Sequence, residues 1–402
     1  VEYRAIVGSV PPGSGVPNIA TATFDSLEGP GGRPDTATDT FTFGVPNLDK
    51  LVTGTSLADT GTSQFRPTLT DLAIGEILFY DLVVTLPAGN TQVVVTDSLL
   101  ALNGIGTLEL VGTPTIALGA GVTATNPAPT LVLTDSNGDG IADRLAWDFG
   151  NVNFVAGGDN QITISVAARA VNVAGNSAGD LLVLPANLDY GFGNVVDVIG
   201  ADIVEPGLTI DKTVTPILAE AGNLVGYQVT LRNDGSGPAY DMALTDVAAP
   251  GLVPEGPVTL LLNGVSTVFA SANDVVVPRL LPGEVALVSY GARIADSVLV
   301  GTVLANTASS PSSSLPGAVP TERIYAPVAD DAAVTLAPST PVTLVKAIPV
   351  PPTSDPNTGD AQIRPGVTDL GIGERATVEL TAVLPRGTVN NVILTDQLTT
   401  PA

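Results

Sequence analysis

The sequence predicts an all-β protein built from tandem β-sandwiches, and three observations lead to this prediction. Gly (43) and Pro (33) are frequent, while helix-type spacing of apolar residues is almost absent. Short alternating apolar segments recur between clusters of Gly, Pro, Asn or Asp, which is the pattern of sandwich strands. The 402 residues exceed one ordinary core and indicate two to four domains.

Six segments show the alternation most clearly, and we expect each to be a strand. Most of them begin after, or end at, residues that favour turns: Gly-Asn before TQVVVTDSLL, Gly-Gly-Asp before NQITISVAARAV, Asn-Asp at the end of GYQVTLRND, Pro-Gly before EVALVSYGARI. The segments are residues 78–87, 91–100, 160–171, 226–234, 284–294 and 376–385.

An internal repeat is the stronger signal. The stretch RPTLTDLAIGEILFYDLVVTLPAGNTQVVVTDSL (66–99) returns as RPGVTDLGIGERATVELTAVLPRGTVNNVILTDQL (364–398). Further residues match at similar offsets: Tyr3 with Tyr290, and Asn18 with Asn306. The chain therefore contains one period of roughly 290–300 residues and an overlap.

Two related modules lie inside that period. Each has a lysine strand, then Gly-x-x-x-x-Tyr, then Thr-Asp closing a strand, then an Arg-bearing strand and a final Asn segment. We expect an A-type sandwich at 44–200 and a B-type sandwich at 206–325. Residues 1–43 match the C-terminal part of a B-type sandwich, and 340–402 match the N-terminal part of an A-type sandwich. The chain is therefore expected to be a window on a longer array.

The composition excludes several function classes. The sequence has no Cys and no His, which removes thiol nucleophiles, His-based acid–base chemistry and the usual zinc ligands. The net charge of −25 argues against nucleic acid and anionic membranes as partners. No uncharged apolar stretch is long enough to predict a membrane span. We expect no enzyme activity, and read the Asp330–Asp331 pair as a strand-end turn.

The stretch DKTVTP…AGNLVGYQVTLRNDGSGPAYDMALTDVAAPGL…LANTAS (211–309) carries a family resemblance. It resembles the repeated domain of large bacterial and archaeal surface proteins, a family without an assigned function that overlaps isopeptide-forming fimbrial and adhesin-stalk modules. The similarity is good over the B-type module and looser over the A-type module. It implies immunoglobulin-like sandwiches in tandem, exported to the cell surface and structural rather than catalytic.

The resemblance also implies a role for lysine, which occurs only three times. In isopeptide-forming relatives a buried lysine on the first strand bonds to an asparagine on the last strand, assisted by a carboxylic acid. Burial lowers the lysine pKa and raises that of the acid, which favours this chemistry. Carried over by position, the sets are Lys50–Asn187 with Asp97, Lys212–Asn306 with Asp246, and the half-sites Lys346 and Asn18.

Alternatives to the covalent interpretation remain. Asp81 and Glu76 are rival acids in the A-type module, and Asn194 is a rival acceptor. The lysines could also form buried but unbonded pairs with aspartate, or lie exposed where they discourage edge pairing. Restriction of lysine to one position per module favours a dedicated role.

DSNGDGIAD (135–143) predicts a calcium loop. Oxygen ligands stand at alternate positions with a glycine at the sixth, which is the spacing that surrounds Ca²⁺ with hard oxygens in EF-hand-type loops. The alternative is an Asx-rich turn that needs no metal. The predicted ligands are Asp135, Asn137, Asp139, the Ile141 carbonyl and Asp143.

These features predict an extracellular structural protein, a segment of a surface fibre, stalk or filament. Modules cut at both ends would leave strand edges that a continuing array or a neighbouring copy fills, so we expect self-association or continuation. The alternative is an adhesin module that recognises a glycan or host surface. An exposed aromatic platform would support that alternative, but aromatic residues make up only 4% of the sequence.

Overall fold

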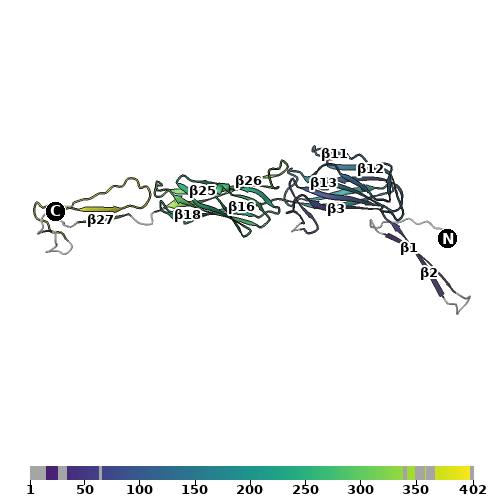
Figure 1. Cartoon of the computed structure of the whole chain (residues 1–402), viewed down its shortest axis with the longest axis horizontal. Coiled ribbons are helices and arrows are strands. Elements are labelled where there is room, and N and C mark those ends of the chain that lie inside the picture. The colour runs from purple at the N-terminus through teal and green to yellow at the C-terminus, as the bar shows by residue number, and fades with distance from the viewer. Residues whose placement is uncertain are drawn as a thin grey trace.

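The protein folds into two β-sandwiches that lie end to end, flanked by a strand pair at each end of the chain (Figure 1). The computed structural model describes residues 15–25, 34–62, 66–337, 342–348, 358 and 367–398. Over these residues the secondary structure consists of strands and one short 3-10 helix, η1 (Ala272–Asp274), without any α-helix. The predicted all-β fold of tandem sandwiches is confirmed.

The first sandwich, here called module A, packs an eight-stranded sheet against a five-stranded sheet. The larger sheet contains, in spatial order, β10 (Val122–Ala124), β12 (Arg144–Phe154), β7 (Gly89–Ser98), β14 (Leu181–Asp189), β15 (Asn194–Val204), β5 (Thr70–Ala73) and β4 (Gly61–Thr62), with β11 (Val132–Thr134) beside β12. The smaller sheet contains β3 (Asn47–Thr55), β6 (Ile77–Thr85), β13 (Gln161–Ala170) and β8 (Leu108–Leu110), with β9 (Thr115–Leu118) beside β13.

The second sandwich, module B, packs a five-stranded sheet against a six-stranded sheet. The first contains β16 (Leu208–Thr215), β18 (Leu224–Asn233), β24 (Val285–Ile294), β21 (Leu252–Leu262) and β22 (Val265–Phe269). The second contains β17 (Leu218–Ala219), β26 (Ile324–Leu336), β25 (Val303–Ser313), β19 (Ala239–Ala243) and β23 (Val276–Leu280), with β20 (Thr245–Ala248) beside β25.

Alternation in the sequence explains the two cores. In β13 every second residue, from Ile162 to Ala170, is buried, while the residues between them face outward or are half-buried. Because successive side chains of a strand point to opposite faces, such strands present one apolar face to the opposing sheet. Module A centres its core on Trp147, Tyr80 and Phe149, and module B centres its core on smaller residues around Tyr227.

The end of module B differs from the expected boundary. The prediction closed this module at residue 325, but β26 runs on to Leu336. The strand pairs antiparallel with β25 and supplies Val334 and Leu336 to the core, so module B needs it. The strands of module A run from Asn47 to Val204, close to the expected 44–200.

The strand pairs outside the two sandwiches are β1 (Gly15–Asp25) with β2 (Pro34–Gly44), and β27 (Thr343–Ala347) with β28 (Glu379–Val383). In the second pair Lys346 lies opposite Leu380. Lys50 lies opposite Leu82 in the same way in module A, and the two leucines occupy matching places in the sequence repeat. The lysine register of module A therefore recurs in β27 and β28.

A polar network joins module A to module B. Arg323 donates to Asn172 Oδ1 (2.8 Å) and to the Val173 carbonyl (2.8 Å), both in module A. It also donates to Glu205 Oε1 (2.7 Å), which accepts a further hydrogen bond from the Tyr325 hydroxyl (2.9 Å). Since Glu205 lies in the short connection between the modules, this network restricts how one sandwich turns on the other.

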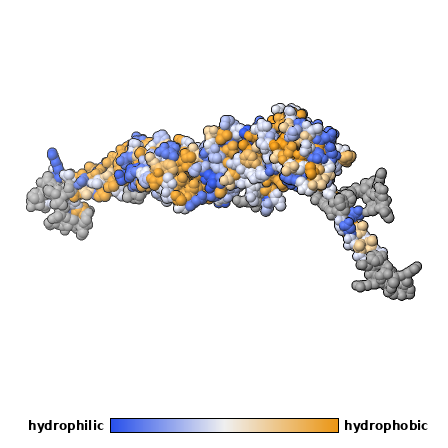
Figure 2. Space-filling model, turned by 45° about the vertical axis from the view of Figure 1, so that its right-hand side comes forward, coloured by the Kyte–Doolittle hydropathy of each residue, from blue (hydrophilic) through white to orange (hydrophobic). Residues whose placement is uncertain are grey.

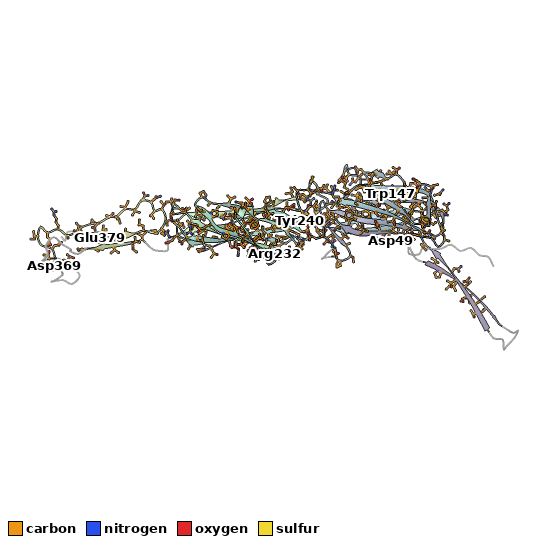
Figure 3. The ribbon with its side chains drawn as sticks, in the orientation of Figure 1. Asp49, Trp147, Arg232, Tyr240, Asp369 and Glu379 are labelled. Atoms are coloured by element: carbon orange, nitrogen blue, oxygen red, sulfur yellow. The ribbon has the colours of Figure 1, made fainter. Side chains whose placement is uncertain are left out.

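A second set of contacts lies near Asp59 of module A. Its carboxylate accepts hydrogen bonds from the Tyr240 hydroxyl (2.8 Å) and from Arg279 (2.7 Å). Figure 3 places Tyr240 where the two sandwiches meet. The buried Ser314 hydroxyl also donates to the Ile74 carbonyl across the junction (2.8 Å). The junction is therefore built from matched donors and acceptors on both modules.

The surface explains the positive mean hydropathy of the sequence (+0.37). Figure 2 shows hydrophobic side chains intermixed with hydrophilic ones over the visible faces of both sandwiches. Valines and leucines thus occupy outward positions of strands as well as the cores. Among the residues that the structure describes, none belongs to a helix long and apolar enough to cross a membrane.

Substituting Gly75 by Ala should loosen the junction. Gly75 has a φ of +85°, and a Cβ there would lie 2.5 Å from the Thr321 carbonyl oxygen of module B. Gly112→Ala is the matched control, because Gly112 has a φ of +70° and nothing within 4 Å of such a Cβ. We expect the control to cost only the left-handed backbone penalty of about 1–2 kcal/mol.

Gly75→Ala should cost more than the control in thermal unfolding of the whole chain. It should also accelerate amide hydrogen exchange at Ser314 and Arg323, because beside the junction the Ser314 amide donates to the Arg323 carbonyl and the Arg323 amide donates to Ser314 Oγ. Equal stability and equal exchange in the two variants would contradict this role of Gly75.

Candidate functional site: a buried lysine in each sandwich

Module A encloses an ion pair between its two sheets. Lys50 Nζ from β3 lies 2.5 Å from Asp97 Oδ1 from β7, and neither side chain is exposed to solvent. The Tyr80 hydroxyl, from β6, donates to the other carboxylate oxygen of Asp97 (2.6 Å). The ammonium also lies over the Tyr80 ring, 4.6 Å from its centre. Each oxygen of the Asp97 carboxylate thus accepts a hydrogen bond from a buried donor.

Strand geometry places the lysine inside. Leu48 and Lys50 are the inward residues of β3, two positions apart. The backbone N–H of Lys50 points away from β6 and donates to Asp197 Oδ2 of β15 (2.7 Å). This bond satisfies a donor on the edge of the smaller sheet and holds β3 against the larger sheet.

Module B repeats the arrangement and adds an amide. Lys212 from β16 forms an ion pair with Asp246 from β20, and its backbone N–H donates to Asp330 Oδ2 (2.7 Å). Lys212 Nζ also donates to the Tyr290 hydroxyl of β24 (2.8 Å), which donates to Asp246. Asn306 Nδ2 of β25 donates to the same hydroxyl oxygen (3.0 Å). Lys212 and Asn306 are both buried.

Burial sets the protonation equilibria at both sites. Desolvation lowers the pKa of Lys50 and of Lys212, although the neighbouring aspartates act in the opposite direction. Desolvation and the adjacent Asp246 raise the pKa of Tyr290, and they raise that of Tyr227 to about 12. The neutral form of the lysine amine is therefore more accessible at both sites than it is in water, and the tyrosine phenols stay protonated.

The structure does not bring Asn187 to Lys50. Asn187 alternates with the inward residues Ala186 and Leu188 of β14, so its side chain lies on the outer face of the sheet. There its Oδ1 accepts a hydrogen bond from Asn194 Nδ2 (3.0 Å). The predicted Lys50–Asn187 pairing is thus incompatible with this strand orientation, and the exposed Asn194 lies on the same outer side.

Leu184 occupies the position in module A that Asn306 occupies in module B. In module A, Ala186 lies opposite Asp97, and Leu184 stands two positions before it. In module B, Ala308 lies opposite Asp246, and Asn306 stands two positions before it. The neighbouring strand gives the same correspondence. Leu184 pairs with Ile199, two residues after Asp197, and Asn306 pairs with Ala332, two residues after Asp330. Module A therefore has a leucine where an amide acceptor would stand.

The alignment error has a simple origin. Matching the Ala-Asn dipeptides of the two modules placed Asn187 at Asn306, whereas the strand pairing places Asn187 at Ser309. The difference of three positions is an odd number, and an odd shift moves a strand residue to the opposite face. The asparagine also lies on β25 rather than on the last strand, β26.

Sequence reasoning missed the tyrosines as site residues. Tyr80 and Tyr227 are equivalent, because each lies on the strand paired with the lysine strand. Each stands two positions before the residue opposite the lysine, which is Leu82 in module A and Val229 in module B. Tyr290 pairs with Tyr227 across β18 and β24, and the corresponding partner of Tyr80 is Val166. Tyr290 is thus particular to module B. The match of Tyr290 with Tyr3 in the sequence repeat is the signal that could have marked it as a site residue. Tyr3 itself lies outside the described residues.

The rival acids lie elsewhere. Glu76 is buried, but its carboxylate accepts hydrogen bonds from the amides of Ala73 (2.7 Å) and Leu57 (3.1 Å) and from Thr60. It therefore fixes the turn before β6 and the loop after β3. Asp81 alternates with the inward Tyr80 and Leu82 and is half-buried on the outer side of β6.

The predicted half-sites are exposed in the described part of the chain. Lys346 Nζ lies 2.7 Å from Asp396 Oδ1, so the third lysine also pairs with the aspartate of its own Thr-Asp motif. About half of the lysine side chain (46%) is exposed, in contrast to Lys50 and Lys212. Asn18 lies on β1 and is exposed.

The predicted calcium loop follows β11 in module A. Asp135 accepts hydrogen bonds from the amides of Gly138 (2.7 Å) and Gly140 (2.8 Å), which lower its pKa. Asp139 accepts from the Ile141 amide (2.8 Å) and from Asn137 Nδ2 (3.0 Å). The acidic side chains thus curl the loop around itself, as an Asx-rich turn does.

Asp143 differs from the other acids of the loop because it is fully buried. Its Oδ1 accepts from the Ser136 amide (3.0 Å), whereas its Oδ2 has no hydrogen-bond partner within the described part of the chain. No group of three or more His, Cys, Asp or Glu side chains converges as a metal cluster among the described residues. For Asp135, Asp139 and Asp143 to share one cation, their carboxylates would therefore have to come closer together than they lie here.

Comparison with known proteins gives no family. No protein-family model and no curated protein matches the sequence. Among solved structures, the chain is similar to the 35 kDa C-terminal fragment of the major pilin of Streptococcus agalactiae (12% identity, 70% of this chain and 91% of that chain, TM-score 0.26). It is also similar to the major pilin subunit of Bacillus cereus (12% identity, 78% and 81%, TM-score 0.26) and to the collagen adhesin of S. aureus (10% identity, 71% and 95%, TM-score 0.20). Similarity at this level assigns neither a family nor a function to the chain.

Removing the lysine of module A should destabilise that module strongly. Lys50→Met leaves the buried Asp97 charge without its counter-ion, and breaking a buried pair in this way costs roughly 3–5 kcal/mol. Urea unfolding followed by fluorescence of Trp147 measures this, because Trp147 is the only tryptophan in the chain and lies in the core of module A.

The double variant Lys50→Met with Asp97→Leu removes both charges and serves as the control. It should recover most of the loss, leaving about 1–3 kcal/mol for the Tyr80 hydroxyl that then lacks its acceptor. A single variant as stable as the native protein would show that the pair does not support the fold.

Proposed function

We propose that this chain is a load-bearing segment of an extracellular surface fibre or stalk, in which module B carries an intramodule cross-link between Lys212 and Asn306. The observation that supports the proposal most directly is the position of the two reacting groups. Lys212 Nζ and Asn306 Nδ2 are both buried and both lie within hydrogen-bond distance of one oxygen, that of Tyr290.

The environment suits amide exchange. The lowered pKa of Lys212 favours the neutral amine, and Asp246 is in place to take its proton. Attack of Nζ on the side-chain carbonyl carbon of Asn306 would form a Lys–Asn amide and release ammonia. The Oδ1 atom of Asn306 is buried without a hydrogen-bond partner in the described structure, so the amide is held only through the hydrogen bond from its Nδ2 to the Tyr290 hydroxyl.

The cross-link would change how module B bears force. Lys212 belongs to the first strand of one sheet and Asn306 belongs to the other sheet, on the strand before the last, so the bond would join the two sheets. Tension applied through the neighbouring modules would pass from residue 212 across the bond to residue 306, and then along residues 307–336. Residues 213–305 would lie within a closed covalent loop and would stay folded under a load that separates hydrogen-bonded strands.

The arrangement of the modules supports the structural part of the proposal. Modules A and B lie end to end, the junction is built from the contacts of Arg323 and Asp59, and the lysine register recurs beyond module B. Such a repeat suits continuation in a longer array or self-association into a filament. We propose no nucleic-acid partner, since the net charge is −25.

An adhesive role receives less support from the surface. Recognition of glycans or host surfaces through aromatic stacking requires a cluster of exposed aromatic side chains. Among the described residues the exposed phenylalanines are Phe79 on β6 and Phe192 between β14 and β15. Phe79 lies on the five-stranded sheet and Phe192 on a loop between two strands of the eight-stranded sheet, so they do not form one platform.

We also propose that the loop at 135–143 binds Ca²⁺ as a structural ion. Asp135, Asn137, Asp139 and Asp143 would supply side-chain oxygens and Ile141 its carbonyl, and the buried unpartnered Oδ2 of Asp143 supports a cation nearby. The ion would supply positive charge to this acidic loop and would tie β11 to β12, the strands on either side.

The Asn306→Leu variant tests the cross-link, because leucine is what module A carries at this position. The intact mass of the native chain should be lower than its sequence mass by the roughly 17 Da of one ammonia. Asn306→Leu should have its full sequence mass. Its module B should melt roughly 10–20 °C lower, because a closed loop of about 100 residues is worth about 4.7 kcal/mol in the chain-entropy description of cross-links.

Asn187→Leu is the matched control for that experiment. Since Asn187 lies on the outer face of module A, this variant should retain the loss of one ammonia. A native chain of unmodified mass would refute the cross-link, and a mass change that depends on Asn187 would transfer it to module A.

Calcium should stabilise module A alone. At a hundredfold excess over its dissociation constant the ion would add about 2.7 kcal/mol. The unfolding of module A, followed by Trp147 fluorescence, should therefore shift upward by several degrees between chelator and excess Ca²⁺, while the transition of module B, followed by calorimetry, stays fixed. Asp143→Asn should abolish the shift. Identical melting of the native chain in both conditions would rule out a structural ion.

A further inference from the structure

The Tyr290 hydroxyl occupies the centre of the module B site. It accepts hydrogen bonds from Lys212 Nζ (2.8 Å) and Asn306 Nδ2 (3.0 Å), and it donates to Asp246. The nucleophilic nitrogen and the leaving nitrogen of the proposed cross-link thus share one contact. The two nitrogens lie no farther apart than the sum of these two distances.

Tyr227 provides a comparison within the same core. Its ring stacks on that of Tyr290, with centres 5.4 Å apart and planes at 18°. Its hydroxyl, however, is buried without a hydrogen-bond partner among the described residues. The position of the Tyr290 hydroxyl therefore does not follow from aromatic packing alone.

Amide exchange requires a proton for the leaving nitrogen, because an amide anion is a very poor leaving group. Asp246 accepts hydrogen bonds from Lys212 and Tyr290 through its Oδ2, whereas Asn306 Nδ2 donates to Tyr290. The structure gives no direct hydrogen bond between the described Asp246 and Asn306 side chains. The phenol is the group that links the acid to the leaving nitrogen.

We propose that Tyr290 is a catalytic residue of cross-link formation, which transfers the proton from the Lys212–Asp246 pair to Asn306 Nδ2. This inference rests on the proposed cross-link. Asp246 first takes one proton from the lysine ammonium. The neutral Nζ then attacks Cγ of Asn306, forming the new C–N bond while the carbonyl electron pair moves to Oδ1.

Proton transfer then completes the exchange. Tyr290 gives its phenolic proton to Nδ2 and takes in exchange the proton that Asp246 holds. The lysine nitrogen then gives a second proton to Asp246. The Cγ–Nδ2 bond breaks, the carbonyl re-forms and ammonia leaves, after which ammonia takes the proton of Asp246 as ammonium. The products are the Lys–Asn amide, ammonium, a neutral phenol and an ionised carboxylate, so atoms and charge balance.

Module A agrees with this assignment. It keeps the lysine, the aspartate and a tyrosine equivalent to Tyr227, but has Val166 at the place of Tyr290 and Leu184 at the place of Asn306. The proposed catalyst and the acceptor are thus absent together. In the sequence of residues 1–43, which matches module B, Tyr3 and Asn18 occur together at the corresponding positions.

Tyr290→Phe is the test, with Tyr227→Phe as the matched control. The full-length chains are made by cell-free translation, and the intact mass of each is followed over time against its own sequence mass. Tyr290→Phe should lose ammonia roughly 10²-fold more slowly than the native chain, the usual contribution of a positioned proton donor. Tyr227→Phe should react at the native rate, because the hydroxyl that it removes makes no hydrogen bond to Lys212, Asp246 or Asn306.

The outcomes separate the two proposals. A native chain that never loses ammonia refutes the cross-link itself, whereas a native rate in a folded Tyr290→Phe chain overturns only the role of Tyr290. If Tyr290→Phe does not fold, 3,5-difluorotyrosine at position 290 keeps the ring and hydroxyl and makes the phenol more acidic. A changed pH profile of ammonia loss would support proton transfer by this residue, and an unchanged profile would overturn it.

Discussion

The rest of each sandwich depends on one buried ion pair. A lysine ammonium and an aspartate carboxylate between two apolar sheets are costly to desolvate, so each must find its partner for the module to fold. Because Lys50 lies on one sheet and Asp97 on the other, their contact specifies both the register of β3 and the way the sheets face each other. The hydrogen bond from the Lys50 amide to Asp197 adds a second constraint on the same strand. Lys212 repeats both constraints in module B, which explains why lysine occurs at one position per module while arginine serves the surface and the junction.

The two modules show how a common frame supports different chemistry. Module A uses the pair as a structural element, with Leu184 beside it and Tyr80 on the carboxylate. In module B an amide replaces the leucine and a second tyrosine enters from β24, so that the lysine faces a group with which it can react. Two substitutions thus separate a buried salt bridge from a candidate cross-linking site. The lysine, the aspartate and the edge contact of the lysine amide are the same in both modules.

Much of this was predictable from the sequence, and the failures have physical causes. Period-2 alternation and the internal repeat identified the sandwiches, because those signals arise from the strand geometry itself. The match of Lys50 with Asp97 followed from short motifs at equivalent strand ends. The face on which Asn187 lies could not be predicted, since an uncertain loop length before β14 left the register open by an odd number of residues. The extension of module B to Leu336 was missed because β26 carries Asp330 and Asp331, whose acidic character resembles a turn. The contacts of Arg323 with Glu205 join residues distant in sequence and leave no local pattern.

The distribution of stabilising features along the array follows from the same comparison. On the proposed function, tension acts equally on every module in series, so the whole segment is only as strong as its weakest sandwich. Module B would gain strength from the Lys212–Asn306 bond, which module A lacks because Leu184 replaces the acceptor. Module A instead has the larger core, built around Trp147 and Phe149, and the loop at Asp143 for which we propose a bound cation. A cation that ties β11 to β12 acts on the eight-stranded sheet, to which the aspartate of the buried pair also belongs. The proposed metal and the proposed cross-link would thus both strengthen their modules. Each acts on the sheet that carries the aspartate partner of the lysine.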